Sequence, residues 1–155
     1  MKMNNDEIER TVICYIIKDN QVLMLYRNKK EHDINKNKWI GVGGHIENGE
    51  EPIDAIIREV KEETNLDIIR CEKRANIIFH FGEHIEFMHV FVCLEFKGEI
   101  NYDCNEGELK WINISDVYSL PIWEGDVLFL KRIFDNEPFF EMSMWYDKDK
   151  LVKYQ

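Results

Sequence analysis

The sequence lacks any long, uninterrupted apolar run. No apolar stretch approaches the roughly 20 residues that a membrane-spanning helix needs. The first ten residues, MKMNNDEIER, have no apolar core of the kind that signal peptides carry. We therefore expect no membrane partner and a cytoplasmic location.

Cysteine is sparse and widely spaced along the chain. The four cysteines form no CxxC pair: Cys14, Cys71, Cys93 and Cys104. This spacing does not favour a disulfide framework or a metal cluster bound by cysteine. We expect reduced thiols, which agrees with a cytosolic protein.

Positive charge is in deficit. The chain has 20 lysines and arginines against 30 acidic residues, which gives a formal net charge of −10 at pH 7. A negative protein is repelled by nucleic-acid backbones and anionic membranes, so we expect no nucleic-acid partner. A polyphosphate substrate would also be repelled, unless metal ions and local basic residues reverse the sign of the charge inside a cleft.

Repeats, low-complexity segments and linkers are absent as well. A chain of 155 residues with 45% apolar and 12% aromatic residues is typical of one folded globular domain. We expect residues 1–155 to form a single domain, either as a monomer or as a homodimer.

Strand-like and helix-like segments follow one another along the chain. Asp19 and Asn20 tolerate positive φ and suit a two-residue hairpin turn. Helical spacing of apolar residues predicts one helix from Pro52 and another over 124–134, with a brief helix at 116–119 capped by Ser115. The expected strands are 11–17, 21–26, 67–70, 74–81, 85–96, 109–112, 138–146 and 151–154, with a loop over 97–108. This order predicts an α/β fold with a mixed sheet packed between helices.

The most informative stretch runs from Gly43 to Leu66 and has the sequence GGHIENGEEPIDAIIREVKEETNL. A glycine pair and a polar turn precede Pro52, which suits the first turn of a helix because proline has no N–H to leave unpaired. The apolar residues that follow recur at helical spacing: Ile53, Ile56, Ile57 and Val60. We expect them to form the buried stripe of the helix.

Three glutamates share a second face of the same helix. Glu59, Glu62 and Glu63 occupy positions i, i+3 and i+4, and each close pair of like charges costs roughly a few tenths of a kcal/mol. A solvated acidic face is one interpretation of such a pattern. The other is a divalent-cation site, because Mg²⁺ takes carboxylate oxygens and keeps water and phosphate oxygens as its remaining ligands.

This stretch resembles the Nudix box, G-x5-E-x7-R-E-U-x-E-E-x-G-U, in which U is apolar. Eight of the nine specified positions match: Gly44, Glu50, Arg58, Glu59, Val60, Glu62, Glu63 and Leu66. Asn65 replaces the box glycine, and asparagine tolerates the left-handed conformation of a helix C-cap. The resemblance implies the Nudix α/β/α sandwich from about Thr11 to the C-terminus.

The resemblance also implies a reaction, in which water attacks a phosphorus of a nucleoside diphosphate linked to another group. Glu59, Glu62 and Glu63, with the carbonyl of Gly43, are the implied ligands of Mg²⁺ or Mn²⁺. Such ions neutralise phosphate oxygens and lower the pKa of water. Arg58 is expected to pair with Glu50 and to hold the turn against the helix.

Further site residues lie outside the helix. An acid on the loop before a late strand is the general base in many family members, and Glu106 matches that spacing better than Glu108. Arg27 is a candidate phosphate clamp. His45 stands where relatives often have lysine and is a second candidate for a phosphate contact.

The C-terminal third is similar to the branch that hydrolyses oxidised purine nucleoside triphosphates. Trp123 and Asp126 match its base-stacking and edge-recognising positions, whereas Gly125 and Ile40 replace an aspartate and an asparagine. We therefore expect cleavage of several nucleoside triphosphates to monophosphate and pyrophosphate, with only a modest preference for oxidised purines. Hydrolysis of ADP-ribose or a dinucleoside polyphosphate is the alternative, and an inactive binding module of the same fold is a third.

Overall fold

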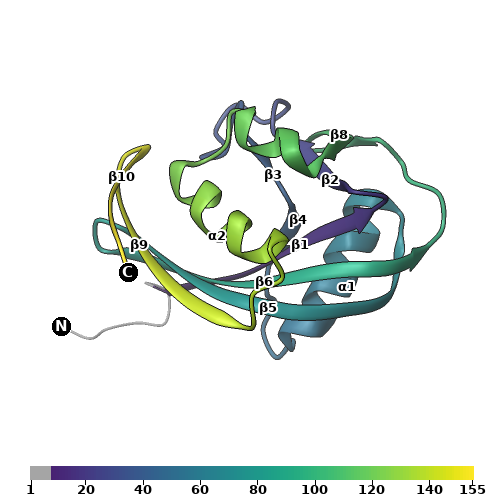
Figure 1. Cartoon of the computed structure of the whole chain (residues 1–155), viewed down its shortest axis with the longest axis horizontal. Coiled ribbons are helices and arrows are strands. Elements are labelled where there is room, and N and C mark those ends of the chain that lie inside the picture. The colour runs from purple at the N-terminus through teal and green to yellow at the C-terminus, as the bar shows by residue number, and fades with distance from the viewer. Residues whose placement is uncertain (1–7) are drawn as a thin grey trace.

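The structure is a computed structural model that describes residues 8–155, so residues 1–7 of the polar N-terminal segment lie outside it (Figure 1). Its strands are β1 (Ile8–Lys18), β2 (Gln21–Tyr26), β3 (Trp39–Ile40), β4 (Val42–His45), β5 (Asp67–Phe81), β6 (His84–Lys97), β7 (Asp103–Cys104), β8 (Gly107–Asn113), β9 (Phe140–Asp147) and β10 (Lys150–Tyr154). Its helices are α1 (Pro52–Thr64), α2 (Glu124–Phe134) and the short 3-10 helix η2 (Ile114–Ser119).

Strand β1 lies in the middle of a mixed sheet. The strand order is β10-β9-β5-β6-β1-β2-β8-β7, with β3 paired to β2 and β4 paired to β1. Strands β1 and β6 run parallel, as do β5 and β9, while the other pairs are antiparallel. The predicted mixed sheet is therefore confirmed.

The sheet lies between α1 and α2 (Figure 1). Alternate residues of β1 point to opposite faces, as the pleat requires. Cys14 and Ile16 pack in the core beneath α1, whereas Ile13 and Tyr15 pack in the core beneath α2. This is the predicted α/β/α arrangement. Within residues 8–155 no helix is long and apolar enough to cross a membrane.

Several local predictions are confirmed by the backbone. Asp19 and Asn20 form the turn between β1 and β2 with φ of 52° and 63°. Helix α2 has the predicted bounds. Helix α1 ends at Asn65, which has φ of 70° and whose N–H donates to the carbonyl of Lys61. Asparagine therefore caps this helix in the left-handed conformation for which glycine is the usual residue.

The expected apolar stripe of α1 is wrong in part. Ile56 and Val60 are fully buried, but Ile53 and Ile57 are 41% and 42% exposed. The buried face instead continues through Ala55, Glu63 and Thr64. Helix α1 turns its acidic face partly toward the sheet, and this rotation moves the two isoleucines outward.

Three further expectations need correction. Residues 67–81 form one continuous strand, and register shifts absorb the irregular stretch around Arg70 and Lys73. The predicted loop 97–108 contains β7 and the start of β8, joined by a two-residue turn at Asn105 and Glu106. Ser115 lies inside η2 and caps nothing, because η2 begins after Asn113.

Replacing Asn65 tests its role at the end of α1. Both Asn65→Gly and Asn65→Ala remove the hydrogen bond from the Asn65 side chain to the Glu99 carbonyl, which measures 3.1 Å. Only alanine strains the left-handed backbone, at about 1–2 kcal/mol. We expect the alanine variant to be less stable than the glycine variant by roughly that amount. Equal midpoints in urea unfolding would contradict this assignment.

Candidate active site

The glycine pair allows strand β4 to lie unusually close to its neighbours. A Cβ atom on Gly43 would lie 1.9 Å from the carbonyl oxygen of Val12 in β1. One on Gly44 would lie 2.5 Å from the carboxyl carbon of Glu59 in α1. Both distances are far below van der Waals contact, so only glycine brings the strand, the helix and the Glu59 carboxylate together here.

Arg58 ties the turn before α1 to the helix. Its Nε and Nη2 donate to the two carboxylate oxygens of Glu50 at 2.8 and 2.9 Å, which confirms the predicted pair. Nη1 also donates to Glu59 at 2.8 Å, and Nη2 donates to the carbonyl of His45 at 3.1 Å. The guanidinium lowers the pKa of Glu50 to about 2, so this bidentate pair stays ionised near neutral pH.

Glu63 is the most isolated acid of the site. The residue is 8% exposed, and neither carboxylate oxygen has a hydrogen-bond partner among residues 8–155. Burial, followed by the charges of Glu106 and Glu59, raises its pKa to about 9. The charge of Arg27 lowers the pKa to a smaller extent, and so does the backbone of Gly43, although no hydrogen bond is completed there.

The acids fit a hard divalent cation by their chemistry. Burial also raises the pKa of Glu59, and the charges of Glu62 and Glu106 add to this rise. In the observed rotamers the carboxylates of Glu59 and Glu62 point toward Arg58. Within residues 8–155, no group of three histidine, cysteine, aspartate or glutamate side chains is arranged so that it could hold a metal ion. The unpartnered oxygens of Glu63, beside two further acids, nevertheless form a donor set that a cation would neutralise.

Arg27 connects two loops next to these acids. Its Nη1 donates to Glu106 at 3.0 Å and its Nε to Asp33 at 2.7 Å. Lys30 also reaches Glu106, at 3.2 Å. Glu108, the other candidate base, is exposed and accepts a hydrogen bond from the Asn28 side chain instead. Of the two acids, therefore, Glu106 is the one whose charge acts on Glu59 and Glu63.

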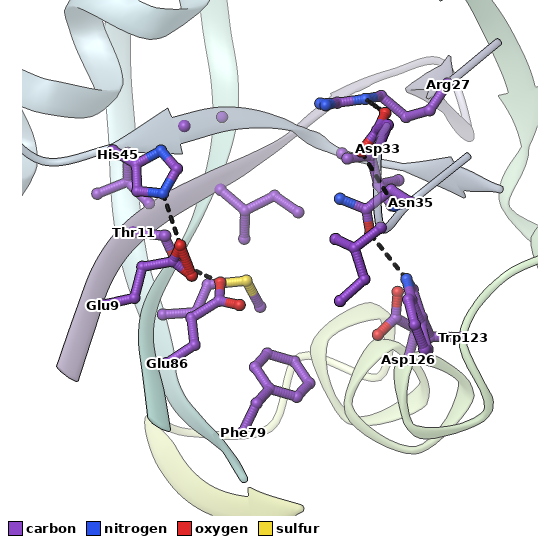
Figure 2. Close-up of a pocket in the computed structure, with 18 of the residues that line it drawn as sticks. Glu9, Thr11, Arg27, Asp33, Asn35, His45, Phe79, Glu86, Trp123 and Asp126 are labelled. Atoms are coloured by element: carbon purple, nitrogen blue, oxygen red, sulfur yellow. Dashed lines mark hydrogen bonds and ion pairs between the residues drawn. The ribbon is translucent and has the colours of Figure 1, made fainter. Parts of the chain in front are cut away.

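A single pocket of about 600 Å³ joins most of the predicted site residues. It extends between β1, β4, β6, α2 and the loop after β2 (Figure 2). The predicted residues that line it are Arg27, Ile40, Gly43, His45, Glu59, Glu106, Trp123 and Asp126. Arg58, Glu62 and Glu63 do not line the pocket, but each interacts with a residue that does. Arg58 donates to Glu59, the charge of Glu62 raises the pKa of Glu59, and Glu63 interacts electrostatically with Glu59 and Glu106.

The end of the pocket near α2 is aromatic. Trp123 is 9% exposed and meets Phe81 and Tyr146 edge to face, with ring centroids 6.1 and 5.3 Å apart. Its indole N–H donates to the Asn35 side-chain oxygen at 2.8 Å (Figure 2). Asp126, on the first turn of α2, is 6% exposed, and burial with the charge of Glu86 raises its pKa to about 8.

His45 lies at the rim of the pocket and is already engaged. Its Nε2 lies 2.7 Å from a carboxylate oxygen of Glu9 (Figure 2). The other carboxylate oxygen of Glu9 lies 3.3 Å from Nε2 of His84. A phosphate would have to compete with Glu9 for this imidazole.

Several polar residues of the pocket were not predicted from the sequence, among them Asp33, Asn35 and Glu86. The first two belong to the polar loop after β2, in which no single residue stands out. Glu86 had a usable signal, since it lies on the same face of β6 as Met88, Val90 and Val92. A lone acid among apolar residues on a buried strand face indicates either a partner or a function.

Comparison with known proteins gives a consistent result. The model of the NUDIX domain family matches residues 7–133. An uncharacterised Nudix hydrolase of Bacillus subtilis, YvcI, is 31% identical over 124 residues, which cover 77% of this chain and 75% of the relative. The oxidized purine nucleoside triphosphate hydrolase of Danio rerio is 25% identical over 145 residues, with 92% and 90% coverage. A MutT mutator protein from Bacillus halodurans has the same fold, with a TM-score of 0.85, 24% identity and coverage of 95% and 96%.

The buried acid predicts how the metal-free protein responds to pH. The pKa of Glu63 is about 9 in the folded state, against an ordinary value of 4.5. At pH values between these two, the folded state keeps a proton that the unfolded state has lost. Stability should therefore fall as the pH rises through this window. Glu63→Gln should make that slope shallower, leaving the contribution of Asp126, and should stabilise the metal-free protein by about 1–3 kcal/mol at pH 7.

Urea unfolding at several pH values, with chelator present, measures this effect. Glu72→Gln on the exposed face of β5 is the matched control and should keep the wild-type slope. Adding Mg²⁺ or Mn²⁺ should stabilise the wild type more than Glu63→Gln. If the cation raises the free energy of unfolding of both proteins by the same amount, Glu63 is not a ligand.

Proposed function

This chain belongs to the Nudix hydrolase family and hydrolyses pyrophosphate bonds, and from this premise we propose that its substrates are purine nucleoside triphosphates, oxidised purines included. The products would be the nucleoside monophosphate and pyrophosphate. The observation that supports this proposal is the continuity of the pocket. One end carries the acids Glu59 and Glu106 beside Arg27, and the other end carries Trp123 and Asp126.

The aromatic end suits a purine base. Stacking on an indole requires only a flat ring, so Trp123 favours any purine. Ile40 lines the pocket where similar sequences have asparagine, so this wall of the pocket lacks that hydrogen-bonding side chain. Asn35 and Glu86 are polar groups of the same pocket, so discrimination between bases does not depend on Asp126 alone. The resemblance to oxidized purine nucleoside triphosphate hydrolases points to the same substrate class.

The acidic end suits the triphosphate. Glu59, Glu62, Glu63 and the carbonyl of Gly43 would hold Mg²⁺ or Mn²⁺, which supplies charge neutralisation of the phosphates and a water of lowered pKa. Arg58 positions Glu59 and the Glu50 turn without touching the substrate. Two nitrogens of Arg27 already bind carboxylates, so a phosphate would use the third.

Glu106 is our candidate for the general base. It lines the pocket and interacts electrostatically with Glu59 and Glu63, and Arg27 and Lys30 fix the position of its carboxylate. A carboxylate so placed can accept the proton of the attacking water as the bond to phosphorus forms.

Glu106→Gln should lower kcat by about 10²–10⁴ while leaving the concentration of Mg²⁺ needed for half-maximal activity nearly unchanged. The amide keeps the shape of the side chain but cannot accept the proton. Glu108→Gln is the matched control, because Glu108 belongs to the same hairpin but lies outside the pocket. If the Glu108 variant is the inactive one, or if both variants turn over normally, Glu106 is not the base.

A nucleotide screen tests the substrate. With Mg²⁺ present, we expect purine nucleoside triphosphates to yield pyrophosphate and no inorganic phosphate, and chelation to abolish the activity. Rapid cleavage of ADP-ribose or a dinucleoside polyphosphate, without turnover of triphosphates, would favour the alternative substrate class. No turnover of any nucleotide would favour the inactive binding module.

A further inference from the structure

Two acidic side chains face the aromatic end of the pocket from opposite sides. Asp126 extends from α2 beside Trp123, and Glu86 extends from β6 on the facing wall, with Phe79 below them (Figure 2). Within residues 8–155 neither carboxylate forms an ion pair with a lysine, arginine or histidine. The nearby imidazoles of His45 and His84 pair with Glu9 instead.

Position 125, next to Asp126 on α2, is a glycine and contributes no side chain to the pocket. A Cβ atom on Gly125 would lie 2.3 Å from the sulfur of Met144 and 2.6 Å from the hydroxyl oxygen of Tyr146, so a side chain here would have to displace both. The Tyr146 hydroxyl also accepts a hydrogen bond from the Gly125 N–H at 2.7 Å. In this packing Asp126 of α2 is one acid of this end of the pocket, and Glu86 of the sheet is the other.

The surroundings of Glu86 leave one of its oxygens available to a ligand. The Thr11 hydroxyl donates to Oε2 at 2.7 Å (Figure 2). Burial raises the pKa of Glu86, and the hydrogen bond from Thr11 opposes this rise by stabilising the ionised carboxylate. No hydrogen bond within the described part of the chain is formed by Oε1. An ionised carboxylate accepts hydrogen bonds and donates none, so a ligand must present an N–H or O–H group to this wall.

Purines differ in what they present to opposite walls. A guanine ring has N1–H and an amino group on one edge, and on the opposite edge N7 is an acceptor. Oxidation at C8 places a hydrogen on N7 and converts that acceptor into a donor. Asp126 can accept from the N1–H and amino edge of guanine whether its carboxyl is ionised or protonated. An ionised Glu86 on the opposite wall is satisfied only by a donor, and an ordinary purine places the N7 lone pair against this carboxylate.

We propose that Glu86 is a specificity-determining residue that recognises the N7–H of 8-oxopurines, while Asp126 binds the opposite edge, which oxidised and ordinary purines share. This inference rests on the proposed function and adds the group that separates the two classes of purine. Placing the N7 lone pair of an ordinary purine against the Glu86 carboxylate is costly. The expected discrimination between oxidised and ordinary purines therefore exceeds what an apolar contact gives.

Glu86→Gln is the direct test, because the amide can donate to N7 where the carboxylate cannot. We expect the ratio of kcat/KM for 8-oxo-dGTP to that for dGTP to fall by about tenfold or more, partly through faster dGTP hydrolysis. Asp126→Asn is the matched comparison, and it should change kcat/KM for both nucleotides by similar factors. Thermal unfolding should show that both variants remain folded.

Binding without metal gives a second readout. Quenching of tryptophan fluorescence by 8-oxo-dGMP and dGMP measures the affinity for each base directly, and Glu86→Gln should narrow the difference between the two Kd values. An unchanged ratio in both assays would overturn the role of Glu86 and leave the proposed function intact. A wild-type protein that binds neither monophosphate and hydrolyses neither triphosphate would overturn both proposals.

Discussion

Glu63 carries a carboxyl group into the interface between α1 and the sheet, where no donor from the described part of the chain forms a hydrogen bond with it. The arrangement around it follows from the need to tolerate negative charge in a confined space. The Gly43–Gly44 pair makes room for the neighbouring Glu59, and Arg58 neutralises part of the charge while it fastens the preceding turn. An acidic helix face that would otherwise be solvated is thus turned inward, and a cation can complete it.

The part of the site around Trp123 is built from different elements, but it too contains buried acids. The rings of Phe81 and Tyr146 pack edge to face against Trp123. Burial raises the pKa of Asp126 and of Glu86, and this cost in solvation is offset where a ligand provides the missing hydrogen bonds. Under the proposed function, base recognition and phosphate hydrolysis would take place at two ends of one cavity, each with its own buried acids.

Local chemistry made part of this structure predictable. The hairpin turn at Asp19–Asn20, the cap at Asn65, the pair Arg58–Glu50 and the bounds of α2 follow from conformational preference, spacing and motif. The rotation of α1 did not follow, because four apolar positions allow more than one buried face and only packing against β4, β1 and β5 selects between them. Asn35 reaches the pocket through tertiary packing of a polar loop, which no local pattern encodes. Glu86 is detectable as an acid on an otherwise apolar strand face, but its position in the pocket depends on the tertiary packing of β6. The roles of the site residues remain predictions.

The loop after β2 touches both ends of the cavity. Arg27 and Asp33 fasten it beside Glu106, and Asn35 fastens it to the indole of Trp123. The backbone N–H of Asn35 donates to Asp33, so the two anchors are two residues apart. A loop held in this way fixes the position of Trp123 relative to Glu106. Substitutions at the two ends of the cavity should therefore have non-additive effects, because a shift of Trp123 is transmitted through the loop to the groups around Glu106.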